Sequence, residues 1–150
     1  MLTAPFLLSQ AFARQLPEGA TGNIVNLLDQ RVWKLTPYFL SYTVAKSGLW
    51  TLTRALALAL APRIRVNGIG PGPTLPSPRQ SPEQFAEQCR AMPLGRGTTL
   101  EEICAALQFI LSAPAMTGQM IALDGGQHLG WAQPSRDASH ASESGAEATE

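Results

Sequence analysis

Two short apolar segments frame a long helical pattern in the middle of the chain, and this arrangement limits the possible folds. Residues 23–28, NIVNLL, and residues 63–70, RIRVNGIG, have the length and composition of buried strands. Between them, residues 38–61 carry apolar side chains at helical spacing, and Pro62 follows. Strands that alternate with helices form parallel sheets, so the sequence predicts an α/β fold.

Further elements continue this alternation. Residues 4–16 have a four-residue apolar repeat typical of a helix, and residues 120–126, MIALDGG, are predicted to form a third strand that ends in a turn. Two more helices are expected to open at Ser81 and at Thr98 or Thr99, because these hydroxyls can accept hydrogen bonds from free backbone N–H groups. The expected domain therefore holds about three strands and four helices.

The composition changes after about Trp131. Residues 131–150 are rich in Ala, Ser and Glu and show no apolar period, so we expect a disordered tail behind a single domain at residues 1–130. His140 lies in this tail, which argues against a catalytic role for it.

Charge and cysteine content exclude several classes of protein. The formal net charge is zero and no basic stripe is present, so a nucleic-acid surface is not expected. No segment reaches the ~18 to 20 apolar residues of a membrane span, and the N-terminal apolar run lacks the basic residues of a signal peptide. Cys89 and Cys104 fit no metal-binding or CxxC spacing. We therefore expect a cytoplasmic protein with no metal ion, nucleic-acid partner or membrane anchor.

Tyr42 and Lys46 form a candidate catalytic pair within the long helical segment. Residues four apart lie on one face of a helix, and a nearby ammonium group favours the phenolate and lowers the phenol pKa from about 10. A tyrosine adjusted in this way can exchange protons in carbonyl reduction or alcohol oxidation. The same spacing is found in ordinary surface pairs, which contribute only a few tenths of a kcal/mol.

Four motifs that surround this pair follow one another in the order found in one enzyme family. The motifs are NIVNLLD, SYTVAKSGLWTLTRALALALAPRIRVNGIGPGPT, MPLGRGTTLEEICAALQFIL and TGQMIALDGG. In their order and spacing they resemble the short-chain dehydrogenases/reductases, over roughly residues 1–130. The resemblance implies a Rossmann-like, doubly wound parallel sheet, NADP or NAD as the cofactor, and a small-molecule substrate.

The resemblance also implies roles for individual residues. Tyr42 would be the catalytic acid/base, and Lys46 would bind the nicotinamide ribose and lower the pKa of Tyr42. Pro71, Gly72 and Thr74 would line the nicotinamide side of the cofactor. A simple turn is the alternative for the Pro-Gly pair, and a turn is the preferred interpretation of the later Asp-Gly-Gly sequence.

Asp29 departs from the common pattern of the family. Counting back from Tyr42, it occupies the position where common members carry a serine that steadies the substrate carbonyl. An aspartate there, together with the sequence GPGPT, is similar to the pteridine-reductase branch, in which Asp, Tyr and Lys form the active site. A carboxyl group in a half-buried pocket can relay a proton or bind the amino group of a pterin. The alternative is a solvated aspartate at the end of a strand.

The N-terminal residues MLTAPFLLSQAFARQLP resemble the middle helix of the family, with Met1 where members usually have an asparagine. The glycine-rich loop of the family precedes that helix, so we expect the chain to represent the C-terminal half of a reductase. Such a chain would bind dinucleotides weakly and expose the edge of the strand at 23–28. It would form a homo-oligomer through the helices at 4–16 and 38–61.

The expected function is therefore NAD(P)-dependent hydride transfer to a carbonyl or to a pterin-like C=N bond. Tyr42 would act as the proton donor, and the isolated chain would be weakly active or inactive. The alternative is a non-catalytic fragment that mediates interaction or oligomerisation, or a decayed reductase. In that case Tyr42 and Lys46 would be inherited and not used.

Overall fold

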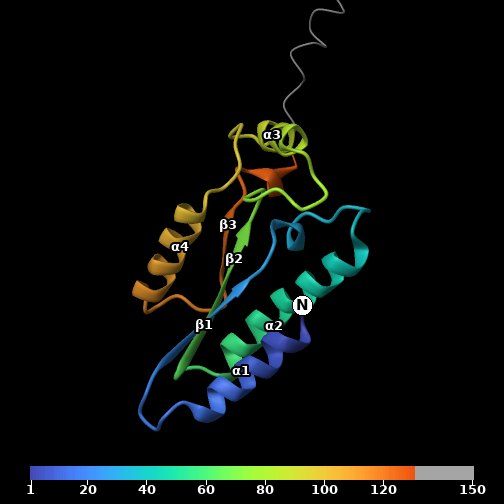
Figure 1. Ribbon diagram of the computed structural model, residues 1–150. Coiled ribbons are helices and arrows are strands. Elements are labelled where there is room, and N and C mark those ends of the chain that lie inside the picture. Colours follow the sequence, from blue (N-terminus) through green and yellow to red (C-terminus); the bar gives the residue numbers. More distant parts are fainter. Residues whose placement is uncertain (131–150) are drawn as a thin grey trace, which may run out of the picture.

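The computed structural model of the chain describes residues 1–130 (Figure 1). Its elements are α1 (Thr3–Gln15), β1 (Gly22–Leu27), η1 (Gln30–Val32), α2 (Leu40–Ala59), β2 (Ile64–Pro71), α3 (Pro82–Arg90), α4 (Leu100–Ser112), β3 (Met120–Leu123) and η2 (Gln127–Leu129), where η marks a 3-10 helix. None of these helices is both long and apolar enough to cross a membrane. The tail expected at 131–150, with His140, lies outside the described residues.

The three strands form one parallel sheet in the order β1–β2–β3, which confirms the predicted α/β class. β2 is the central strand, with Val66 opposite Ile24 of β1 and Ile69 opposite Ile121 of β3. Helices α1 and α2 lie on one side of the sheet and α4 on the other, and α3 lies beyond the carboxyl ends of β2 and β3 (Figure 1). Helices on both faces make the sheet doubly wound.

Alternate side chains of β2 build a hydrophobic core on each face of the sheet. Ile64 and Val66 pack with Ala57 of α2 in one cluster, to which α1 adds partly buried side chains. Ile69 packs on the opposite face with Ile110 of α4. Each fully buried aliphatic side chain of this kind stabilises the fold by about 1.5–3 kcal/mol relative to an exposed one.

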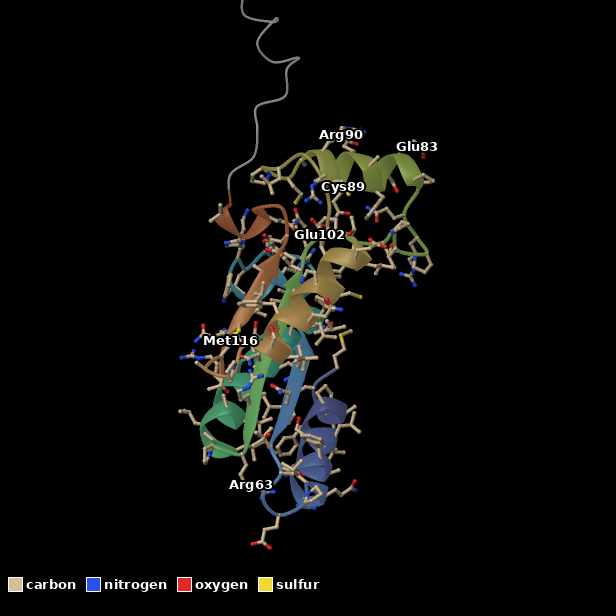
Figure 2. All side chains as sticks on the ribbon, turned by 90° about the vertical axis from the view of Figure 1, so that its left-hand side faces the viewer. Arg63, Glu83, Cys89, Arg90, Glu102 and Met116 are labelled. Atoms are coloured by element: carbon tan, nitrogen blue, oxygen red, sulfur yellow. The ribbon has the colours of Figure 1, made fainter. Side chains whose placement is uncertain are left out.

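Two polar side chains of β2 tie the end of α4 to the start of β3. Arg65 donates from Nη1 to the carbonyl of Met116 at 2.7 Å and from Nη2 to the carbonyl of Ile110 at 2.9 Å (Met116 is labelled in Figure 2). The fully buried Asn67 donates from Nδ2 to the same Met116 carbonyl at 2.9 Å and accepts from the Gln119 N–H at 3.1 Å. These bonds satisfy the Ile110 carbonyl in the last turn of α4 and backbone groups of the connection between α4 and β3.

Ser81 and Thr99 cap α3 and α4 as the sequence predicts. Ser81 Oγ accepts from the Gln84 N–H at 3.2 Å, and Thr99 Oγ1 accepts from the Glu102 N–H at 3.2 Å. In both helices the side chain three residues after the cap, Gln84 in α3 and Glu102 in α4, accepts a hydrogen bond from the N–H of the cap residue. These capping boxes fix where each helix begins.

The helix predicted at 38–61 is shorter in the structure. It begins only at Leu40, because Phe39 has a left-handed backbone with φ 56° and ψ 47°, and it ends at Ala59. The third strand ends at Leu123, and the Asp-Gly-Gly sequence makes the turn that the sequence predicts, because both glycines have positive φ.

The outer edge of β1 has no partner strand within the part of the chain that the structure describes. This is the edge that the sequence places at residues 23–28. Leu27, at the carboxyl end of β1, is 57% exposed. A strand edge with free backbone N–H and C=O groups favours association with another chain.

Arg65→Ala should lower the free energy of unfolding by about 2 kcal/mol, because it removes the donor of the partly buried Ile110 carbonyl and one of the two donors of the Met116 carbonyl. Urea unfolding followed by circular dichroism measures this change. Arg14→Ala is the control, since Arg14 is exposed on α1, and it should change stability by less than about 0.5 kcal/mol. Equal losses in the two variants would contradict the role given to Arg65.

Candidate active site

Polar side chains gather where the three parallel strands end. Asp29 follows β1, the turn at Pro71 and Gly72 closes β2, and Asp124 follows β3. Ligands of open α/β sheets bind at the carboxyl ends of the strands. Asp29, Pro71 and Gly72 line one cavity of about 350 Å³ together with Tyr42 from α2.

A hydrogen bond joins two of the three predicted catalytic residues, Tyr42 and Asp29. The hydroxyl of Tyr42 donates to Asp29 Oδ2 at 2.8 Å. The other carboxylate oxygen, Oδ1, accepts from the backbone N–H of Arg31 at 2.8 Å and caps η1. Asp29 therefore belongs to a fixed arrangement within the cavity and is not a freely solvated side chain at the end of a strand.

The pKa of Tyr42 is raised well above that of a free phenol. Burial is the main cause, followed by the hydrogen bond to Asp29 and the negative charge of that residue, while the charge of Arg31 acts in the opposite direction. The expectation that Lys46 lowers the pKa of Tyr42 is therefore wrong for this structure. The phenol remains protonated at neutral pH and is a hydrogen-bond donor.

Lys46 shares a face of α2 with Tyr42, as the four-residue spacing predicts. Its Nζ lies 5.6 Å from the centre of the Tyr42 ring and donates to the Leu27 carbonyl at 2.7 Å. Burial lowers the pKa of Lys46, and the charge of Asp29 partly opposes this effect. Both side chains of the pair are partly buried at the end of β1, which differs from the ordinary exposed surface pair.

A close backbone contact requires the glycine of the Pro-Gly turn. A Cβ at position 72 would lie 2.7 Å from the Cα of Asp124, so any side chain there would collide with the backbone after β3. The N–H of Gly72 donates to the Leu123 carbonyl at 2.8 Å, and Thr74 Oγ1 donates to the Gly72 carbonyl at 3.1 Å. These contacts hold the turn against the end of β3.

Three side chains that the sequence analysis missed line the same cavity from α3 and the loop before it. They are Gln80, Phe85 and Gln88. The Gln80 Nε2 donates to the Gln88 Oε1 at 2.8 Å. The proline-rich segment that leads to these residues has no period, so only its position after the Pro-Gly turn could have pointed to them.

The structure thus brings five of the six predicted site residues around one cavity: Asp29, Tyr42, Pro71, Gly72 and Thr74. Lys46 instead lines a neighbouring groove of about 500 Å³ between α1 and β1. Within residues 1–130, no group of three His, Cys, Asp or Glu side chains is arranged to hold a metal ion.

The polar site at the carboxyl ends of the strands lies where doubly wound parallel sheets bind their ligands. The family model described as Enoyl-(Acyl carrier protein) reductase matches residues 1–128. The chain therefore belongs to the short-chain dehydrogenase/reductase family, which confirms the resemblance of its motifs.

Its relatives include reductases of different substrates. The chain is 36% identical over 137 residues to pteridine reductase 1 of Leishmania tarentolae. The aligned region covers 84% of this chain and 47% of that protein. It is 34% identical over 139 residues to a probable 2,4-dienoyl-CoA reductase of Bacillus subtilis (strain 168). Here the aligned region covers 86% of this chain and 55% of that protein. The chain spans about half the length of these relatives.

Solved structures confirm the Rossmann-like fold. FolM alternative dihydrofolate reductase 1 from Brucella suis, solved in complex with NADP, is 54% identical with a TM-score of 0.85, covering 89% of this chain and 54% of that one. An apo SCOR enzyme from Clostridium thermocellum is 30% identical with a TM-score of 0.74, covering 90% of this chain and 53% of that one.

Tyr42 should ionise only well above pH 10, the approximate value of a free phenol, because burial and Asp29 favour its neutral form. An alkaline titration of the phenolate absorbance, with the Tyr42→Phe variant subtracted, isolates this residue. The raised pKa contributes stability that is complete below about pH 10 and is lost as the pH rises further. Asp29→Asn should lower the midpoint, and a wild-type midpoint at or below that of a free phenol would contradict the arrangement.

Proposed function

We propose that the chain forms the catalytic part of an NADPH-dependent reductase that acts on a pterin-like C=N bond or a related carbonyl. The observation that carries this proposal is the 2.8 Å hydrogen bond from the Tyr42 hydroxyl to Asp29 within the cavity at the strand ends. Pteridine reductase 1 among the relatives supports it, as does the NADP complex of the similar Brucella suis protein.

Tyr42 is the proton donor in this proposal. Its raised pKa keeps the phenol protonated at neutral pH, so it can deliver a proton to an oxygen or nitrogen that gains negative charge during reduction. To deliver this proton, the Tyr42 hydroxyl must release Asp29 and donate to the substrate atom instead. Asp29 stays in place because Arg31 holds its other oxygen, and its freed oxygen can then accept from the amino group of a pterin.

The residues near the strand ends fit the nicotinamide end of the cofactor. Tyr42 and Lys46 supply a hydroxyl and an ammonium group as partners for ribose hydroxyls, and Pro71, Gly72 and Thr74 form a compact wall beside them. NADPH, when bound, supplies the hydride that reduces the substrate. The sequence has no G-x-G-x-x-G loop for the diphosphate, so this chain would hold only part of the cofactor.

The polar lining of the cavity supports a pterin over a simple carbonyl compound. Asp29 provides a carboxylate where common family members have a serine, and the carboxamides of Gln80 and Gln88 line the same cavity. A pterin ring carries several hydrogen-bond donors and acceptors along its edge, which amide and carboxylate groups can match. Phe85 adds a flat apolar surface to this lining.

Association between copies of the chain is a second candidate function, and the outer surface of α1 and α2 favours it. Val44 and Leu58 of α2 are 71% and 84% exposed. A groove of about 460 Å³ beside them is lined by Leu2, Phe6 and Leu52, among other residues of the two helices. Contiguous exposed apolar surface marks interaction sites, so we infer a homo-oligomer through α1 and α2. Such an interface is compatible with a catalytic chain and with a non-catalytic one, so it does not distinguish the two.

Tyr42→Phe should abolish the NADPH-dependent reduction of a dihydropterin, because phenylalanine keeps the ring but has no proton to donate. The loss of NADPH absorbance measures the rate. Tyr38→Phe is the matched control, since Tyr38 is the other tyrosine of the chain and is 70% exposed. A wild-type rate in Tyr42→Phe would overturn the role of Tyr42, and no rate in the wild-type chain would favour the non-catalytic alternative.

The chain should bind NADPH with a dissociation constant in the micromolar range or weaker, because the residues available to it contact mainly the nicotinamide ribose and ring. Calorimetric titration of residues 1–150 measures this affinity. Lys46→Met should abolish the remaining binding, whereas Lys34→Met, which alters the other lysine, should not. Submicromolar affinity in the wild-type chain would show that the diphosphate is held as well.

A further inference from the structure

A buried carboxylate outside the proposed catalytic pair is bonded to a histidine. Asp124 is 3% exposed, and its Oδ2 accepts from His128 Nδ1 at 2.8 Å and from the His128 backbone N–H at 2.7 Å. Its Oδ1 accepts from the Gly126 N–H at 3.0 Å. A buried carboxylate with three donors has a fixed orientation, and it fixes the tautomer and the orientation of the imidazole. The proton transfer proposed for Tyr42 does not involve this pair.

The imidazole contacts the segment that follows η1. The ring centres of His128 and Trp33 are 5.2 Å apart, with the ring planes at 72°, which is an edge-to-face contact. The next residue, Lys34, lies over Gly130, where an added Cβ would stand 3.4 Å from the Lys34 Cε. On its other side η1 is held by Val32, which packs against the core cluster beneath α2. The segment is therefore held between this core cluster and η2.

The position of η1 sets the orientation of Asp29. Asp29 is the cap of η1, and its Oδ1 accepts from the Arg31 N–H at 2.8 Å while its Oδ2 accepts from Tyr42 at 2.8 Å. A displacement of η1 would turn the carboxylate away from the phenol. Asp124 also lies against Gly72, so the same residue borders both loops of the candidate site.

We propose that Asp124 and His128 are positioning residues that hold η1 through Trp33 and thereby keep Asp29 against Tyr42. The catalytic importance of this arrangement rests on the proposed function. Its geometry can be tested without cofactor or substrate, so the two proposals can fail separately. The Asp-Gly-Gly sequence is then both a turn, as the sequence suggests, and the anchor of the Asp29 loop.

Two measurements on the full chain test this proposal. The first is the hydrogen-exchange rate of the Arg31 amide, which reports the cap of η1. The second is the alkaline midpoint of Tyr42, obtained with Tyr42→Phe subtracted in each background.

Trp33→Ala removes the contact from the loop side at a residue that is 46% exposed, and Trp33→Phe keeps a ring edge there. His128→Ala removes the contact from the other side, and Ile110→Val lowers stability in the distant core beneath α4.

Trp33→Ala and His128→Ala should speed Arg31 exchange by about tenfold, the effect of losing one aromatic contact, and should lower the Tyr42 midpoint. Trp33→Phe should restore both values, and Ile110→Val should change neither. Wild-type exchange and midpoint in a folded Trp33→Ala chain would overturn the proposal. Equal changes in Ile110→Val would also overturn it, because general loosening would then explain the effect. If His128→Ala does not fold, the comparison of Trp33→Ala with Trp33→Phe decides the question.

Discussion

The pairing of β2 on both of its edges is the constraint on which the rest of the structure depends. A strand with partners on both sides and helices on both faces must carry apolar side chains in both directions, which Val66 and Ile69 provide. Its polar residues, the partly buried Arg65 and the fully buried Asn67, are acceptable because carbonyls and an N–H group of α4 and of the α4–β3 connection satisfy them. The path of β2 therefore fixes α4, β3 and the turn at Pro71.

The candidate site follows from this constraint. Because all three strands run in one direction, the residues just after them meet at one edge of the sheet, although Asp29 and Thr74 are far apart in the sequence. α2 adds Tyr42 from its first turns, since the helix must begin near the end of β1 in order to return along the sheet. Asp124 borders this edge after β3, since its backbone lies close to Gly72 and its buried carboxylate is bonded to His128.

Much of the fold and part of the site could be predicted from local patterns. Apolar periods located the strands and helices, and the capping residues Ser81 and Thr99 marked two helix starts, because these signals depend only on neighbours in the sequence. The meeting of Asp29 and Tyr42 could be anticipated from strand direction. The Gln80–Gln88 pair and the Trp33–His128 contact could not, because they depend on the course of irregular segments that carry no period.

The reversed pKa of Tyr42 shows why spacing alone does not determine chemistry. The four-residue spacing placed Lys46 on the correct face, but that ammonium group is held by the Leu27 carbonyl, whereas Asp29 bonds directly to the phenol. The raised pKa keeps the phenol protonated at neutral pH and also makes it a weaker acid, so its proton leaves only for an atom that has become the stronger base. Burial and the bond to Asp29 together set this environment, and neither can be read from the spacing of Tyr42 and Lys46.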